Sequence, residues 1–266
     1  MYASPDVSFQ PGLVVKEVFT DYKEFQRGAK NHLILNCYRL GNGPFYGVHS
    51  GIQLFNMQIG HADRYEGVMN DGIPPKTCVT IAVVQKAEGT VCVDRVPLRE
   101  GDVIIVDEHT AYRFASSGRA RLAIASIRKM LFEKHVLSIE GLLPAAFHDE
   151  NGAFAALIDR LWAEGERWKA GEVVPARLEA MENEVMRAAG KILTSAPLPG
   201  TAHSPGTAAA FDARDYLLEH LEDIDTVDAL AGRFNISYRT LETSFRLLFG
   251  MTPKQLFVGD TFTLAE

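Results

Sequence analysis

Five side chains near the C-terminus combine polar chemistry with the spacing of one helix face. They are Tyr238, Arg239, Glu242, Thr243 and Arg246, separated by one, three or four residues. An arginine guanidinium group donates two hydrogen bonds to the edge of guanine, and a glutamate carboxylate accepts one from the amino group of cytosine. These residues therefore predict a surface suited to nucleic-acid bases, provided that the segment is helical and that its other face is buried.

The residues around this surface contain start and turn signals for two short helices. Thr226 is expected to cap the first helix and Ser237 the second, with Asn235 in the turn between them. The apolar residues that would face a common core are Val227, Leu230, Ala231, Leu241, Phe245 and Leu248. Two short helices about a three-residue turn predict a helix-turn-helix.

Many side chains of this segment agree in type and spacing with one known pattern. They are Ala229, Leu230, Ala231, Ser237, Arg239, Thr240, Leu241, Phe245, Arg246 and the run from Phe249 to Lys254. In this pattern the segment resembles the first helix-turn-helix of the AraC/XylS family of bacterial transcription regulators. The resemblance implies a cupin-like N-terminal jelly roll that senses an effector or dimerises, with RNA polymerase as a further candidate partner. It implies contacts to promoter DNA from Ser237, Tyr238, Arg239, Thr240, Glu242, Thr243 and Arg246.

The same segment departs from the family's pattern in charge and in length. Family members often carry a basic residue where Thr243 stands, and residues 211–266 hold five basic and ten acidic side chains, a net charge of −5. Because phosphate contacts supply most sequence-independent affinity, one copy of this segment is expected to bind DNA weakly at physiological salt. The family's second helix-turn-helix is expected to be missing, since the sequence ends at Glu266. Either the sequence is a fragment or early-terminated form, or two chains combine to place two recognition helices about 34 Å apart.

The first half of the chain has the composition of a β-sheet domain. Residues 13–127 contain short β-branched and aromatic runs separated by Gly, Pro, Asn and Asp at hairpin-like intervals. No long helical pattern interrupts them, so an antiparallel barrel or sandwich is expected rather than a parallel sheet. The predicted fold class is α+β: an N-terminal antiparallel β-barrel of the cupin-like jelly-roll kind with following helices, then a small all-α helix-turn-helix domain.

The interior of such a barrel is the default cavity for a small-molecule effector. Inward-facing strand residues would form its walls, and a few polar side chains would anchor the ligand. The residues expected to line it are Leu54, Met57, His61, Arg64, Tyr65, His109 and Tyr112. The sequence does not identify the effector.

After Ile127 the apolar spacing changes from two to about 3.6 residues, which predicts helices. One segment has an apolar seam at alternating spacings of three and four, which is typical of a homodimer helix. Its members are Leu178, Met181, Val185, Ala188 and Ile192. The alternative is an amphipathic helix packed on the chain's own barrel, because two heptads do not demand a coiled coil. Residues 196–210 contain three prolines, two glycines and no charged residue, and they predict a linker without regular structure.

Enzyme chemistry finds little support in the sequence. The candidates for metal ligands are His49, His61, Glu66 and His109, but no His-x-His pair is present. The cysteines are Cys37, Cys78 and Cys92. Their apolar surroundings predict buried thiols in a reducing compartment, and the thiol pKa of Cys78 and Cys92 is expected to be raised. No nucleophile elbow, P-loop or dinucleotide motif occurs. We therefore expect no catalysis, no cofactor and no metal.

Composition sets the remaining limits. Apolar residues make up 47% and charged residues 23% of the 266 residues, which is typical of soluble globular proteins, and the net charge is −7. No run of about 18 apolar residues is present, and the N-terminus lacks the basic and apolar regions of a signal peptide. We expect a cytoplasmic protein without a membrane partner.

These observations predict four segments. They are a cupin-like sensing domain (1–127), a helical dimerisation region (128–195), a linker (196–210) and a partial helix-turn-helix domain (211–266). The leading hypothesis is a homodimeric, sequence-specific DNA-binding regulator that responds to a small molecule. Two alternatives stay open: a ligand-binding or interaction protein with a truncated, inactive DNA-binding domain, and a cupin-type metalloenzyme.

Overall fold

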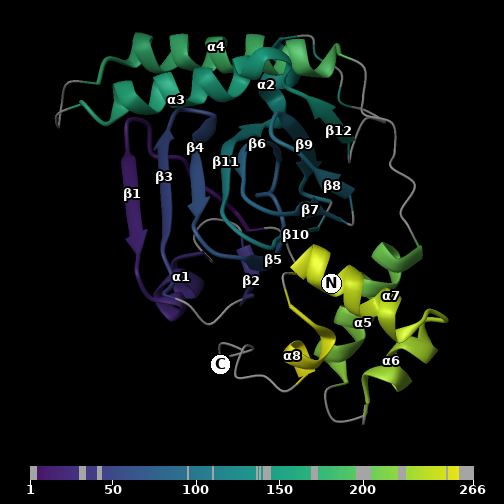
Figure 1. The fold of residues 1–266 in the computed structure, drawn as a ribbon. Helices are drawn as coiled ribbons and strands as arrows, with labels where there is room; N and C mark the ends of the chain where they lie inside the picture. The colour runs from purple at the N-terminus through teal and green to yellow at the C-terminus, as the bar shows by residue number, and fades with distance from the viewer. Residues whose placement is uncertain are drawn as a thin grey trace.

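Two antiparallel sheets face each other in the first half of the chain and enclose a barrel (Figure 1). The structure is a computed structural model that describes the greater part of the chain. The described residues are 5–29, 34–40, 44–94, 96–109, 111–135, 137, 139, 145–168, 173–195, 205–220, 226–249 and 251–257.

Sheet A has the strand order β1-β3-β4-β11-β6-β9-β12 and sheet B the order β2-β5-β10-β7-β8, within the described residues. Neighbouring strands pair antiparallel. The strands of sheet A are β1 (Val14–Phe19), β3 (Gly47–Gln53), β4 (Met57–Arg64), β11 (Ala120–Arg128), β6 (Cys78–Ala87), β9 (Asp102–Asp107) and β12 (Ala145–His148). The strands of sheet B are β2 (Ile34–Arg39), β5 (Val68–Gly72), β10 (Tyr112–Ser116), β7 (Val91–Val93) and β8 (Val96–Leu98). The predicted α+β class with an antiparallel barrel is confirmed.

The helices fall into two groups around this barrel (Figure 1). In the first group, α3 and α4 lie against the outer face of sheet A, and the short α2 follows β11. The second group is a small helical unit beside sheet B, made of α5, α6, α7 and α8. The bounds are α1 (Tyr22–Ala29), α2 (Lys129–Lys134), α3 (Ala153–Gly165), α4 (Pro175–Leu193), α5 (Pro205–Glu219), α6 (Val227–Arg233), α7 (Tyr238–Phe249) and α8 (Pro253–Phe257).

Three apolar cores follow from this arrangement. The largest lies between the outer face of sheet A and helices α3 and α4, and it includes Ile81, Ile158 and Met181. A second fills part of the barrel interior around Phe25 and Phe114. The third joins the outer face of sheet B to the helical unit. Both sheets are therefore covered on their outer faces, so their strands carry apolar side chains in both directions.

The apolar seam of α4 is buried inside the chain itself. Leu178, Met181, Val185 and Ile192 are buried in the core under sheet A, and Ala188 packs against the same core. The prediction of a dimer interface at these residues is wrong, because the apolar stripe is already used to cover the chain's own sheet. The alternative, an amphipathic helix packed on its own barrel, describes α4.

Two boundaries also differ from the prediction, and a short helix lies among the strands. Helix α5 begins at Pro205 and buries Ala209 and Ala210, so part of the expected linker is regular structure. A proline suits the first turn of a helix and alanine has the highest helix propensity, which outweighs the turn signals. Residues 196–204 lie outside the described residues. Strand β12 pairs with β9, so the barrel draws on the segment expected to be helical, and α1 interrupts the strands.

None of the described helices has the length and hydropathy needed to span a bilayer. The two cysteines whose side chains are described, Cys78 and Cys92, are free and buried as expected. Burial raises the pKa of the Cys78 thiol to about 11 and that of the Cys92 thiol to about 12. Thiols with such pKa values are poor nucleophiles at neutral pH. The side chain of Cys37 lies outside the described residues.

Candidate functional site

The helix-turn-helix is built by local side-chain caps. Thr226 Oγ1 accepts a hydrogen bond from the Ala229 N–H at 3.1 Å, and Ser237 Oγ accepts one from the Thr240 N–H at 3.1 Å. Asn235, in the turn between α6 and α7, has a φ of 56°, a left-handed conformation that asparagine tolerates. These caps and the turn confirm the expected boundaries of α6 and α7.

Helix α7 presents a polar face to solvent while its apolar face is buried. Leu241, Phe245, Leu248 and Phe249 pack in the third core with residues of α5, α6 and sheet B. Most of the predicted DNA-contacting residues are exposed to solvent, and the barrel does not cover them. They are Ser237, Tyr238, Arg239, Thr240, Thr243 and Arg246. Glu242 is half-buried, and its carboxylate accepts a hydrogen bond from Arg246 at 3.1 Å. The structure therefore gathers the predicted residues on and beside one face.

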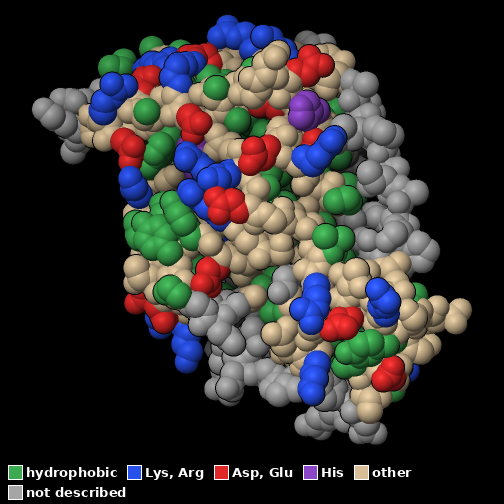
Figure 2. All heavy atoms as spheres, in the orientation of Figure 1, with side chains coloured by type: hydrophobic (Ala, Val, Ile, Leu, Met, Phe, Trp, Pro, Cys, Tyr) green, Lys and Arg blue, Asp and Glu red, His purple; other side chains and the backbone are tan. Residues whose placement is uncertain are grey.

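The charge on this unit is mixed. Figure 2 shows basic side chains on the visible face of the helical unit interspersed with acidic ones. The Glu242–Arg246 pair removes part of the positive charge that Arg246 would offer to a phosphate. The face is therefore suited to specific contacts rather than to strong sequence-independent attraction to DNA.

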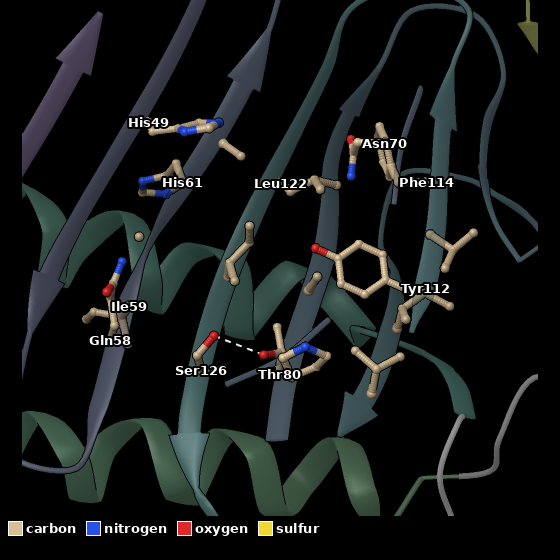
Figure 3. Close-up of a pocket in the computed structure, with 18 of the residues that line it drawn as sticks. His49, Gln58, Ile59, His61, Asn70, Thr80, Tyr112, Phe114, Leu122 and Ser126 are labelled. Atoms are coloured by element: carbon tan, nitrogen blue, oxygen red, sulfur yellow. Dashed lines mark hydrogen bonds between the residues drawn. The ribbon is translucent and has the colours of Figure 1, made fainter. Parts of the chain in front are cut away.

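A cavity of about 130 Å³ lies inside the barrel (Figure 3). Apolar residues of both sheets form most of its walls, and polar groups enter from β3, β4, β5, β6, β10 and β11. The polar lining residues on the described strands include His49, Arg64, Asn70, Thr80, Tyr112 and Ser126. The hydroxyls of Thr80 and Ser126 share a hydrogen bond of 2.9 Å.

Tyr112 reaches the cavity because Gly72 faces it. The two residues are directly paired between β10 and β5, and a β-carbon on Gly72 would lie 2.3 Å from the tyrosine hydroxyl. Figure 3 shows the Tyr112 hydroxyl pointing into the barrel. Burial raises the pKa of this hydroxyl, and the positive charge of Arg64 partly offsets the effect. Tyr112 is therefore a neutral hydrogen-bonding group at neutral pH.

Only part of the predicted effector set lines this cavity. The predicted residues that line the cavity are His61, Arg64 and Tyr112. His61 also contacts α3, because its Nε2 lies 2.9 Å from Asp159 Oδ1 and its ring packs edge-on against Trp162. Burial lowers the pKa of His61, with a further lowering from Arg121 and an opposing effect of Asp159.

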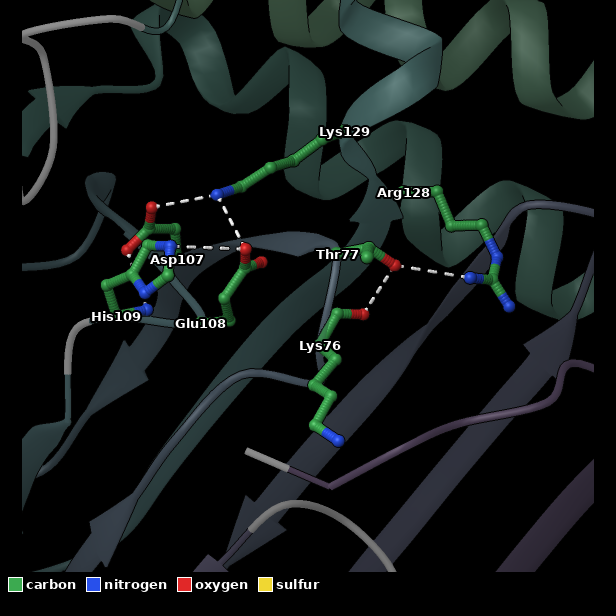
Figure 4. A network of polar contacts seen from close by, with 7 residues as sticks. All are labelled: Lys76, Thr77, Asp107, Glu108, His109, Arg128 and Lys129. Carbon is green, nitrogen blue, oxygen red and sulfur yellow. Dashed lines mark hydrogen bonds and ion pairs between the residues drawn. The ribbon is translucent and has the colours of Figure 1, made fainter. Parts of the chain in front are cut away.

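The remaining four predictions are wrong. Leu54 and Met57 belong to the core between sheet A and its helices, because α3 and α4 cover the outer face of this sheet. Tyr65 is exposed at the end of β4, where the Arg119 guanidinium lies 3.9 Å from its ring centre. His109 is exposed after β9 beside Glu108, in a surface network with Lys129 (Figure 4).

One end of the cavity is covered by the N-terminal segment. Val7 and Phe9 line the cavity together with Pro74 and Pro75. Arg128 holds the segment, because its guanidinium donates to the Val7 carbonyl at 3.0 Å and lies over the Phe9 ring. The same guanidinium donates to Thr77 Oγ1 (Figure 4).

The sequence analysis missed several cavity residues that carried a signal. Thr80 and Ser126 are polar residues within strongly apolar strands, and Asn70 is an amide in the middle of β5. Isolated polar residues in buried strands mark positions that need a partner. Among the described residues, no three His, Cys, Asp or Glu side chains are grouped so that they could hold a metal ion.

Comparison with known proteins identifies a shared fold. The crystal structure of the AraC-like transcriptional activator CuxR superposes with a TM-score of 0.52 and 12% sequence identity, covering 87% of this chain and 89% of that chain. ToxT from Vibrio cholerae gives a TM-score of 0.31 at 8% identity over 76% of this chain and 97% of that chain. No protein-family model and no curated protein sequence matches the chain. The likeness to CuxR covers most of the chain and shows an AraC-like fold. The TM-score for ToxT is too low to show a shared fold.

Proposed function

We propose that this protein is a sequence-specific DNA-binding transcription regulator that is not an enzyme and that responds to a small molecule bound in the barrel. The observation that carries the proposal is the exposed polar face of α7 within a helix-turn-helix. Arg239, Thr243 and Arg246 remain open to solvent while the opposite face of the helix is buried. A recognition helix needs this combination to enter the major groove. The AraC-like fold, which the likeness to CuxR shows over 87% of the chain, agrees with it.

The strand β10 supports a response of the helical unit to the cavity. Its inward residues Tyr112 and Phe114 line the cavity, whereas its outward residues Arg113 and Ala115 contact the helical unit. Strand β10 therefore contributes to the cavity with one face and to the contact with the helical unit with the other. A ligand that favours one position of β10 would shift the balance between arrangements of the helical unit, provided that it binds them with different affinity.

The proposal includes a dimer. The described helix-turn-helix would contact one major groove, and two chains would place two such recognition helices about one helical turn of DNA apart. With the α4 seam buried, the dimer surface must lie elsewhere. Promoter DNA, a second copy of the chain and RNA polymerase are the partners of this proposal.

The decisive experiment compares specific with non-specific DNA. The full chain is titrated with the duplex upstream of its own gene and with a scrambled duplex, at two salt concentrations, by fluorescence anisotropy. Light scattering in the same buffer gives the mass. We expect specific binding by a dimer with a steep salt dependence.

Arg239→Ala tests the recognition face. A bidentate arginine–guanine contact is worth about 1–3 kcal/mol, so the variant should bind the specific duplex roughly tenfold to a hundredfold more weakly and the scrambled duplex almost as before. Lys191→Ala removes an exposed cation from α4 and serves as the matched control. Equal losses on both duplexes would exclude base readout by Arg239. Absence of specific binding by the unaltered chain would leave a ligand-binding protein with an inactive DNA-binding domain.

A further inference from the structure

A positive charge is enclosed in the barrel cavity. Arg64 is only 4% exposed, and its guanidinium carbon lies 5.2 Å from the centre of the Phe114 ring and 5.7 Å from that of Phe25. Guanidinium stays protonated in proteins, so burial does not remove this charge. Its effect extends across the cavity, because it opposes the burial-induced rise of the Tyr112 pKa.

A hydrogen-bond acceptor lies beside the same ring. Asn70 is directly opposite Phe114 in the β5–β10 pair, and it is 1% exposed. Its Oδ1 accepts no hydrogen bond from any described residue. Figure 3 shows the amide pointing into the barrel beside Phe114. Since a buried amide oxygen without a hydrogen bond destabilises the fold, this position favours a ligand that donates a hydrogen bond.

The cavity is small, and apolar residues form most of its wall. Its volume of about 130 Å³ is close to that of an engineered cavity of roughly 150 Å³ that binds benzene. Val84, Leu122 and Ile124 contribute apolar wall. A ligand of about one ring therefore fits, whereas a nucleotide or a long acyl chain does not.

We propose that the cavity binds a small organic carboxylate of about one ring in size, with its anionic group toward Arg64 and a hydroxyl group that donates to Asn70 Oδ1. The proposal rests on the proposed function in that it names the chemical class of the effector. The guanidinium supplies a charge-assisted hydrogen bond, which is stronger than a neutral one. The two phenylalanine rings keep water away from this contact.

Calorimetric titration of the full chain with a matched set of small aromatic compounds tests the proposal. The probes are meta- and para-hydroxybenzoate, benzoate without the hydroxyl, and the neutral meta- and para-hydroxybenzamides. We expect at least one hydroxybenzoate to bind, and benzoate and the corresponding amide each to bind about tenfold or more weakly. Equal binding of the acid and its amide, or no binding by any of the acids, would overturn the proposal.

Two variants separate the charge from the acceptor. Arg64→Met keeps an unbranched side chain without the charge and should abolish the preference for acid over amide, with Arg113→Met on the outward side of β10 as the control. Asn70→Leu should abolish the preference for hydroxybenzoate over benzoate. Circular dichroism checks that both variants fold. If Arg64→Met does not fold, the comparison of acid and amide binding by the unaltered chain tests the contact with the charge. Wild-type affinity for the hydroxybenzoate in a folded Arg64→Met would contradict the assignment.

DNA binding without ligand distinguishes the two proposals. Specific DNA binding without recognition of any carboxylate would leave the regulator intact and remove the ligand class. Carboxylate binding without specific DNA binding would establish the ligand site and remove the proposed function.

Discussion

Arg113 of β10 and Asp215 of α5 form an ion pair across the junction between the barrel and the helical unit. Asp215 also accepts a hydrogen bond from Arg214 Nε at 2.7 Å. Ala115, two residues after Arg113 on the same strand, is fully buried. It lies in the core that Leu40 and Met69 also share with the helical unit. The junction thus has an apolar centre and a polar rim, and the centre should carry most of its stability.

Ala115→Arg should separate the helical unit from the barrel. The new side chain would place a charge in a closed apolar contact, which has no room or partner for it. We expect a larger radius of gyration by small-angle scattering, with the sheet content retained in circular dichroism. Arg113→Met, which removes only the partly exposed ion pair, is the control and should cost at most about 1 kcal/mol. An unchanged radius in Ala115→Arg would mean that the junction tolerates the charge.

Helix α4 gives a second prediction. Met181 is fully buried under sheet A, so Met181→Ala should lower the free energy of unfolding by about 2–5 kcal/mol in urea denaturation. The mass measured by light scattering should not change. Arg187→Ala, at an exposed position of the same helix, should stay within about 0.5 kcal/mol. A lower mass at unchanged stability would instead place the seam in a subunit interface.

The helix-turn-helix could be predicted residue by residue because its signals are local. Thr226, Asn235 and Ser237 act on backbone groups within three residues of themselves, so no tertiary information is required. The overall α+β class follows equally from the change of apolar period after the strands.

The cavity lining could be predicted only in part. With helices on the outer face of sheet A, the apolar Met57 faces outward while the polar Gln58 faces the cavity, contrary to the usual alternation. The α4 seam failed for a related reason. A stripe of apolar residues shows that a helix is covered, but its partner, here the chain's own sheet, is set by tertiary packing.

Ser237 gives a third prediction, in which a residue of the DNA-facing set has a structural role. Its hydroxyl caps α7, so Ser237→Ala should destabilise this helix by about 0.5–2 kcal/mol. Native-state hydrogen exchange of the α7 amides measures this directly. Thr243→Ala, at an exposed position of the same helix, is the matched control. Unchanged protection in Ser237→Ala would show that the cap contributes nothing.

His61 gives a pH-dependent prediction. Burial lowers the pKa of His61 below 6.5 in the folded chain, so the unfolded chain takes up the proton first as the pH falls. The contribution of His61 to stability is therefore fully present above pH 6.5 and is lost as the pH falls through the folded pKa.

We test this with urea denaturation of the unaltered chain and of His61→Gln at pH values from about 7.5 down to about 5. The difference in unfolding free energy should shift in favour of His61→Gln as the pH falls, because glutamine does not titrate. His109→Gln removes a histidine from the surface and controls for the general effect of the substitution. A difference that is independent of pH would mean that His61 takes up its proton equally in the folded and unfolded chains. The same series read by DNA binding would show whether the contact between His61 and Asp159 of α3 also affects the helical unit.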